Sequence, residues 1–490
     1  MSLNSNFFDP TVYLRGLQQI LISDSKKIGF LFGAGTSCSV KKGSSNKSSI
    51  LDINKMTKYI TENLGLKSDK YQIALDKIHD ELNNNNVGFT IENLLSNITQ
   101  KHLIIGDEIL CGLNKDEWFK LKNEIEEEIT KLVSVHKNKE EFCDDFNQGD
   151  FAQWIKNSAR KEAIEIFTTN YDYLLEIALE HNNVPYYDGF IGSYCPFFYS
   201  ASIEDMQFMP TITKLWKLHG SLGWCYDMNS KKITQSLLDD NNIVIYPSYL
   251  KYSNTRKQPY TSFLDRLSRF IKRDDTILFI CGYSFGDYHI NEIINTALEQ
   301  SDSSHVVVFF YDKYIDEGIT LYQLNGECDI KQIALANNKL SVYGMNSAVI
   351  GGKYGIWKLN KSTIRDDGAE QMTLYFDDTI NKEGSISKNV FTRLNPISLE
   401  KSIEIWESFK DNGIIDEEGT IHEEYSQKLG DYDFDDSLSG RRQEIVSLFD
   451  YFKNRNGEGE LKLPDFSIFV YFLKNINADD YIKSLGNKDD

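Results

Sequence analysis

The chain has 490 residues, 41% of them hydrophobic and 13% aromatic, which is enough for about two to four packed domains and excludes wholesale disorder. Its net charge of -20 argues against a general nucleic-acid-binding protein. The seven cysteines are scattered and lack CxxC spacing, and the first segment (MSLNSNFFDP) is unlike a signal peptide. Apolar runs also fall short of the roughly 20 residues that span a bilayer. We therefore expect a cytoplasmic protein without membrane association.

The first predicted elements are a helix and a buried strand. Apolar side chains recur at helical spacing in residues 11–25, which predicts a short amphipathic helix. The stretch IGFLFGAGTSCSV, residues 28–40, is an apolar run that ends in glycines, as expected of a buried parallel strand and the turn after it. A polar, low-complexity segment follows at 41–49, and residues 51–165 have the pattern of a helical insertion.

The glycine turn of this stretch is the first candidate binding element. Gly33 and Gly35 lack a Cβ atom, so the backbone there can turn tightly and approach a ligand. A helix that begins near Thr36 would point free N–H groups at a pyrophosphate, and Ser37 would add a hydroxyl. The alternative is a strand–turn–helix junction that binds nothing, because Cys38 occupies the last glycine position of the GxGxxG motif.

Further units of strand, small polar turn and helix follow along the chain. They cover residues 163–181, 213–224 and 274–300, and another strand is predicted at 305–312. This alternation predicts an α/β fold with a parallel sheet, whose ligands bind at the carboxyl ends of the strands.

The composition changes after about residue 345. A glycine-rich and β-branched stretch is followed by acidic, helical sequence, which predicts a C-terminal α+β region. We therefore expect one domain over residues 1–345 and a second region over 346–490.

Two of the turns carry polar side chains suited to chemistry. In TTNYD, Asn170 can hold a ribose hydroxyl or orient a water molecule, and Asp172 can accept a hydrogen bond from a carboxamide. In KLHGSLGW, His219 precedes a glycine turn and is suited to proton transfer near neutral pH. The alternatives are ordinary helix caps for Asn170 and Asp172, and a structural histidine.

The stretch ICGYSFGDYHIN has the same pattern of strand, glycine turn and helix as the first candidate stretch. Gly282 and Ser284 follow a predicted strand, and Asp287 precedes an amphipathic helix, where it is expected to be an N-cap. Each junction alone is weak evidence. Four of them in order favour a shared site, because they would converge on one edge of the sheet.

The motifs GAGTS, TTNYD, KLHGSLGW and GYSFGDYHIN, in this order, resemble the sirtuin-like domain of bacterial antiviral defence proteins over about residues 10–312. The resemblance implies a Rossmann-like core that binds NAD. It also implies that His219 is the catalytic histidine and that Asn170 and Asp172 lie around the nicotinamide ribose and carboxamide. The remaining cofactor-binding residues that it implies are Gly33, Ala34, Gly35, Thr36, Ser37, Thr169, Gly282, Ser284 and Asp312.

The departures from the deacylase sirtuins change the expected reaction. The two CxxC pairs that hold zinc in those enzymes are missing, and CSVKKGSSNKSS replaces their loop after the glycine motif. No zinc is therefore expected, and the defence branch resembles NAD hydrolases. This implies cleavage of NAD to nicotinamide and ADP-ribose in anti-phage defence. The alternatives are a non-catalytic NAD or ADP-ribose sensor, a zinc-free deacylase, and a structural subunit with a vestigial active site. The resemblance also implies control by homo-oligomerisation, a HerA-type ATPase, a phage protein or a nucleotide signal.

Overall fold

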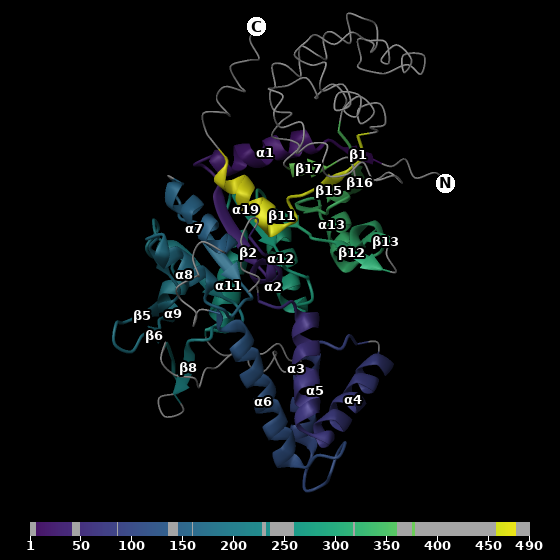
Figure 1. Cartoon of the computed structure of the whole chain (residues 1–490). Coiled ribbons are helices and arrows are strands. Elements are labelled where there is room, and N and C mark those ends of the chain that lie inside the picture. Colours follow the sequence, from purple (N-terminus) through teal and green to yellow (C-terminus); the bar gives the residue numbers. More distant parts are fainter. Residues whose placement is uncertain are drawn as a thin grey trace, which may run out of the picture.

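A ten-stranded sheet forms the centre of the molecule in a computed structural model (Figure 1). The model describes residues 6–41, 50–85, 87–135, 146–158, 160–227, 232–235, 259–316, 319–359, 375–377 and 457–476. The strand order is β1-β16-β15-β14-β11-β10-β2-β3-β7-β4, and the run from β14 to β4 is parallel throughout. The predicted α/β fold with a parallel sheet flanked by helices is confirmed.

The strands of this sheet, in chain order, are β1 (Asn6–Phe8), β2 (Lys27–Phe32), β3 (Glu165–Thr168), β4 (Tyr186–Tyr187), β7 (Thr213–Lys217), β10 (Thr276–Cys281), β11 (His305–Phe309), β14 (Leu340–Tyr343), β15 (Ser347–Ile350) and β16 (Lys353–Trp357). Three small sheets accompany it. They are formed by β5 (Phe190–Ile191), β6 (Phe197–Phe198), β8 (Trp224–Asp227) and β9 (Lys232–Gln235); by β12 (Lys313–Asp316) and β13 (Ile319–Tyr322); and by β17 (Phe376–Asp377) and β18 (Glu460–Leu461).

Helices cover both faces of the sheet because the strand side chains alternate between two apolar cores. Phe30 and Phe32 of β2 enter one core, whereas Leu31 between them enters the other. The first core is completed by α1 (Pro10–Ile22), α7 (Asn147–Asn157), α8 (Leu174–His181) and α19 (Phe466–Lys474). The second is completed by α11 (Tyr260–Ile271), α12 (Tyr288–Glu299) and α13 (Asp329–Ala336). Shorter helices are α2 (Ala34–Cys38), α9 (Ser200–Glu204) and the 3-10 turn η3 (Gln323–Asn325).

The helical insertion is a separate bundle that extends away from the sheet (Figure 1). It consists of α3 (Ile53–Lys67), α4 (Asp69–Asn84), α5 (Ile91–Ile104) and α6 (Lys115–Val133), and its apolar faces enclose a core of their own. Two residues from outside the bundle, Leu174 and Leu222, join this core and are 2% and 1% exposed. The insertion therefore packs directly against the segments that follow β3 and β7.

The sheet continues across residue 345, where a domain boundary was predicted. Strands β14 and β15 lie on either side of that residue and pair antiparallel. Helix α19 packs against the sheet core through Phe466 and Phe469, whose rings meet Phe32 and Phe309. The described residues on both sides thus share one sheet, and the division into 1–345 and 346–490 stays a prediction. The polar segment 42–49 and most of 360–456 lie outside the described residues.

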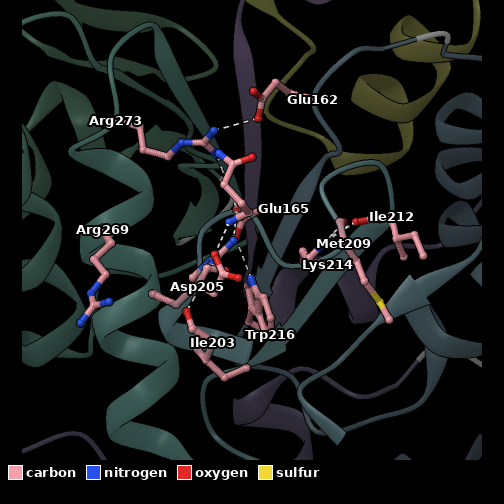
Figure 2. A network of polar contacts seen from close by, with 12 residues as sticks. Glu162, Glu165, Ile203, Asp205, Met209, Ile212, Lys214, Trp216, Arg269 and Arg273 are labelled. Atoms are coloured by element: carbon pink, nitrogen blue, oxygen red, sulfur yellow. Dashed lines mark hydrogen bonds and ion pairs between the residues drawn. The ribbon is translucent and has the colours of Figure 1, made fainter. Parts of the chain in front are cut away.

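A buried polar network braces the start of β3 (Figure 2). Glu165 accepts two hydrogen bonds from the Arg266 guanidinium, at 2.9 and 2.7 Å, and one from the indole of Trp216 at 2.8 Å. Arg266 also donates to the main-chain oxygens of Ile203 and Asp205. Because Glu165 and Arg266 are nearly inaccessible to water, this pair fixes α11 and the α9 segment against the sheet. Among the described residues, no helix is long and apolar enough to cross a membrane.

Candidate functional site

Five parallel strands end in one row, and the candidate motifs follow directly after them. Phe309, Cys281, Phe32, Thr168 and Lys217 are register partners across β11, β10, β2, β3 and β7. The next residues of each chain segment therefore emerge at the same edge of the sheet. The fold thus brings together the turns that carry the glycines, Asn170 and His219, although they lie far apart in the sequence.

Two glycine turns lie back to back at this edge. The Gly33 N–H donates to the Cys281 oxygen at 3.0 Å, and the Gly35 N–H donates to the Gly282 oxygen at 2.9 Å. A Cβ atom on Gly33 would lie 2.5 Å from the Gly282 oxygen, and one on Gly282 would lie 2.5 Å from the Thr36 nitrogen. The glycines are therefore needed for the contact between the two loops, while Ala34 and Gly35 keep their outer surface exposed.

Asn170 and Asp172 hold the first glycine turn in place. The Asn170 amide nitrogen lies 3.0 Å from the Gly33 oxygen, 3.2 Å from the Thr36 hydroxyl and 2.8 Å from the Ser37 hydroxyl. One oxygen of Asp172 accepts from the Ser37 hydroxyl at 2.7 Å, and the other accepts from the Leu174 N–H at 3.0 Å. The two predicted site residues are thus buried and fix the α2 turn to the start of α8.

A buried ion pair lies next to Asp172. The Lys217 ammonium contacts Glu176 at 2.7 Å and donates to the main-chain oxygen of Asp172. Burial raises the pKa of Glu176 to about 7, although the Lys217 charge opposes that shift. Since Lys217 is the last residue of β7, it ties the Asp172 segment to the strand that leads to His219.

His219 is paired with Asp287, a residue from a different motif. Its Nε2 atom lies 3.0 Å from Oδ2 of Asp287, and the two side chains are only 12% and 11% exposed. Oδ1 of the same carboxylate accepts from the His289 N–H at 3.2 Å and caps α12. The predicted N-cap of Asp287 is confirmed, and the same carboxylate also contacts the predicted catalytic histidine.

The other predicted residues lie at the same edge with different degrees of exposure. The Thr169 N–H donates to Phe32, and Ser284 is exposed. Asp312 is 2% exposed, and its two oxygens accept from the main-chain N–H groups of Met345 and Leu324 at 2.8 and 3.2 Å. Burial raises the pKa of Asp312. Both carboxylate oxygens of Asp312 thus accept hydrogen bonds from the main chain of the protein itself. The role of Asp312 at an adenine ribose stays a prediction.

Three residues of this site carried no recognisable signal in the sequence. Glu176 and Lys217 occupy a helix and a strand, and only the register of β7 with β3 brings them together. Gln148 of α7 donates to the Thr36 oxygen at 2.9 Å from a helix that looks ordinary in sequence. Their contribution depends on three-dimensional neighbours that no local pattern records.

The family comparison covers the part of the chain that carries most of this site. The match to the model of the SIR2-like domain runs from residue 164 to residue 335. Residues 164–335 are a SIR2-like domain. The matched range contains Asn170, His219 and Gly282, whereas the Gly33–Ser37 turn lies outside it and joins the SIR2-like domain through β2. A search of curated proteins finds no match.

SIR2-like domains use NAD, so an NAD-related activity fits this part of the chain. Within the described ranges, no group of three or more His, Cys, Asp or Glu side chains is arranged to hold a metal ion. The SIR2-like domain and the adjoining Gly33–Ser37 turn together provide a pair of glycine turns, a buried amide and carboxylate, and a histidine held by a carboxylate.

Proposed function

We propose that the chain hydrolyses NAD at the nicotinamide–ribose bond. In this reaction the bond between C1′ and the nicotinamide nitrogen breaks, water adds to C1′, and nicotinamide, ADP-ribose and a proton are released. The observation that carries the proposal is the convergence of Asn170 and His219 of the SIR2-like domain with the Gly33–Ser37 turn at one edge of the shared sheet. The exposure of Ala34 and Gly35 supports access for a dinucleotide.

The proposed roles follow from the chemistry of the side chains. Because the glycosidic bond breaks through an oxocarbenium-like state, alignment of the reactants contributes more than a strong nucleophile. His219 takes the proton from a ribose hydroxyl or from the attacking water. The hydrogens of the Asn170 amide are used within the protein, so its proposed contact with ribose or water is through Oδ1. Asp172 is proposed to receive the carboxamide of nicotinamide.

The direct test is NAD consumption by the full chain, alone and with each candidate activator (a HerA-type ATPase or a phage protein), followed by chromatography of the products. We expect nicotinamide and ADP-ribose in equal amounts from the wild type and no more than a slow residual rate from His219→Ala. His305→Ala is the matched control, because His305 also makes a side-chain hydrogen bond, 3.1 Å to Ser341, but lies at the opposite end of a strand. Full turnover by His219→Ala under the conditions that activate the wild type contradicts the proposal.

Asn170 requires a gentler substitution than alanine, because its amide holds the glycine turn. Asn170→Asp keeps an acceptor at Oδ1 and removes the hydrogens donated to Gly33 and Ser37. Because the Oδ1 acceptor is kept, we expect turnover to fall through displacement of the glycine turn, which loses the two hydrogen bonds that hold it. A melting temperature that stays within about 2 °C of the wild type would show that this loss is local to the turn and is not a global folding defect.

One observation favours binding without turnover as a second candidate function. The donor hydrogens of Asn170 and both oxygens of Asp172 already serve the protein itself. A sensor for NAD or ADP-ribose would bind at the same edge and use these residues only to shape it. Calorimetric binding of NAD without any product, also in the presence of each candidate activator, would favour this function over hydrolysis.

We further propose that the activity depletes NAD in anti-phage defence, and that homo-oligomerisation, a HerA-type ATPase or a phage protein controls it. The resemblance of the motif set to sirtuin-like defence domains supports this role. Expression in bacteria challenged with phage, with cellular NAD measured over time, tests it. We expect NAD to fall in cells that carry the wild type and to persist in cells that carry His219→Ala.

A further inference from the structure

We propose that Asp287 is a positioning residue that fixes the tautomer and the orientation of the His219 ring. The contact between these two residues is observed, whereas its effect on turnover rests on the proposed NAD hydrolysis. The argument depends on the chemistry of the pair, on the way the Asp287 loop is held, and on the position of the pair above the sheet.

The chemistry of the pair determines which ring nitrogen carries the proton. A carboxylate only accepts hydrogen bonds, so Nε2 of His219 must be the donor across the 3.0 Å contact with Oδ2 of Asp287. In the neutral ring the lone pair is then on Nδ1. The proton that leaves the ribose hydroxyl or the water would therefore be taken up at Nδ1, and Nε2–H would remain directed at Asp287. Low exposure of both side chains strengthens the contact.

The loop that carries Asp287 is held by several contacts besides the cap of α12. The Tyr283 hydroxyl donates to the main-chain oxygen of Asp287 at 3.1 Å and also lies 3.0 Å from Oδ1 of Asn291. The Asn291 amide in turn donates to the oxygen of Phe285 at 2.7 Å. Phe285 has a φ of 58°, which is unusual for a non-glycine residue and persists only where the surroundings enforce it.

The pair also spans the centre of the candidate site. His219 follows β7 and Asp287 follows β10, and β2 and β3 lie between those two strands. Three strand spacings amount to about 14 Å, so the two loops must reach toward each other over the strand ends that carry Gly33 and Asn170. The second glycine turn, at Gly282, is docked on the first, so the loop that orients His219 and the Gly33–Ser37 turn are parts of one packed unit.

The decisive variant is Asp287→Asn. Asparagine keeps an oxygen for the His289 N–H, so the cap of α12 persists, but its NH2 group would face Nε2 and favour the other tautomer of His219. We expect kcat to fall by at least about 100-fold and by up to about 10⁴-fold, as when asparagine replaces the aspartate beside a catalytic histidine, with KM for NAD nearly unchanged. Asp465→Asn is the matched control, since Asp465 caps α19 with the same acceptor geometry, 2.9 Å from the Ser467 N–H.

A double-mutant cycle distinguishes positioning from a structural role. In the His219→Gln background, Asp287→Asn should cause no further loss of residual turnover, because the ring that it orients is gone. Equal losses in both backgrounds, or a kcat of Asp287→Asn within twofold of the wild type, would overturn the proposal. The same holds if Asp465→Asn lowers kcat as much as Asp287→Asn does.

A measurement without turnover keeps this inference separate from the proposed function. The full chain with 15N-labelled histidine gives ring nitrogen signals, and His219 is assigned by its loss in His219→Gln. We expect Nε2 to be the protonated nitrogen in the wild type and the signal pattern to change in Asp287→Asn. If the wild type consumes no NAD but this change is seen, hydrolysis fails while the positioning contact stands. An unchanged His219 pattern in Asp287→Asn overturns the inference.

Discussion

Replacement of Gly282 by alanine should separate the two glycine turns and lower the free energy of unfolding by about 2–4 kcal/mol. The φ of 63° at this position costs an alanine about 1–2 kcal/mol. The new Cβ atom would also lie 2.5 Å from the Thr36 nitrogen and 2.8 Å from the Gly35 carbon. Both are backbone atoms, so the loops must move apart from 2.5 Å toward 3.4 Å. This weakens the Gly35–Gly282 hydrogen bond, which contributes about 1 kcal/mol.

The chain provides a matched control in Gly351. Its φ of 58° is nearly the same, but no heavy atom lies within 4 Å of a Cβ built there. Gly351→Ala should therefore show the backbone cost alone, about 1–2 kcal/mol. Urea unfolding of both variants and of the wild type measures the difference, and NAD turnover should fall only in Gly282→Ala. If both variants lose the same free energy to within about 0.5 kcal/mol, the loops yield easily and the reasoning is refuted.

Two further predictions concern buried charges. Burial raises the pKa of Glu176 from its ordinary 4.5 to about 7 in the folded chain. Between these two values the folded state binds a proton that the unfolded state has released, so the fold is more stable at low pH. This extra stability is lost as the pH rises through 7. The free energy of unfolding should therefore fall by about 2–3 kcal/mol between pH 5 and 8. Urea unfolding of Glu176→Gln, which carries no titrating group at this position, should lack this fall. Identical pH profiles of the two proteins would contradict the raised pKa of Glu176. Arg266→Met removes both guanidinium hydrogen bonds of the buried Glu165 and leaves Arg273, at 4.0 Å, as a more distant cation. It should cost about 3–5 kcal/mol in the same assay. Arg269→Met, one turn along the same helix, should cost less than about 1 kcal/mol, and equal losses would refute the importance of the buried pair.

The elements with strong local signals were predicted from the sequence. The apolar runs before Gly33, Asn170 and Gly282 became β2, β3 and β10, because a short β-branched or aromatic run that stops at a small polar turn is itself the pattern of a buried parallel strand. Their convergence at one edge followed from the alternation of strands and helices, which forces a parallel sheet.

The features that were missed depend on contacts between distant residues. Strand β1 (Asn6–Phe8) pairs with β16, which lies after residue 345, and the sequence of neither strand indicates its partner. Likewise, Asp287 was predicted as an N-cap from its position before a helix, but its contact with His219 arises only because the β7 and β10 loops meet above the sheet. Local propensity predicts elements, whereas tertiary packing decides which side chains share a site.

Leu174 and Leu222 pack in the core of the helical insertion, and this packing limits which segments of the chain can be deleted. These two leucines lie two and three residues beyond Asp172 and His219, and the Leu222 N–H donates to the main-chain oxygen of Tyr171 at 3.0 Å. Deletion of residues 53–133 would leave both leucines without their apolar surroundings, in the same two loops that carry the amide, the carboxylate and the histidine. The smallest unit expected to fold with an ordered site therefore includes a bundle that supplies no candidate site residue.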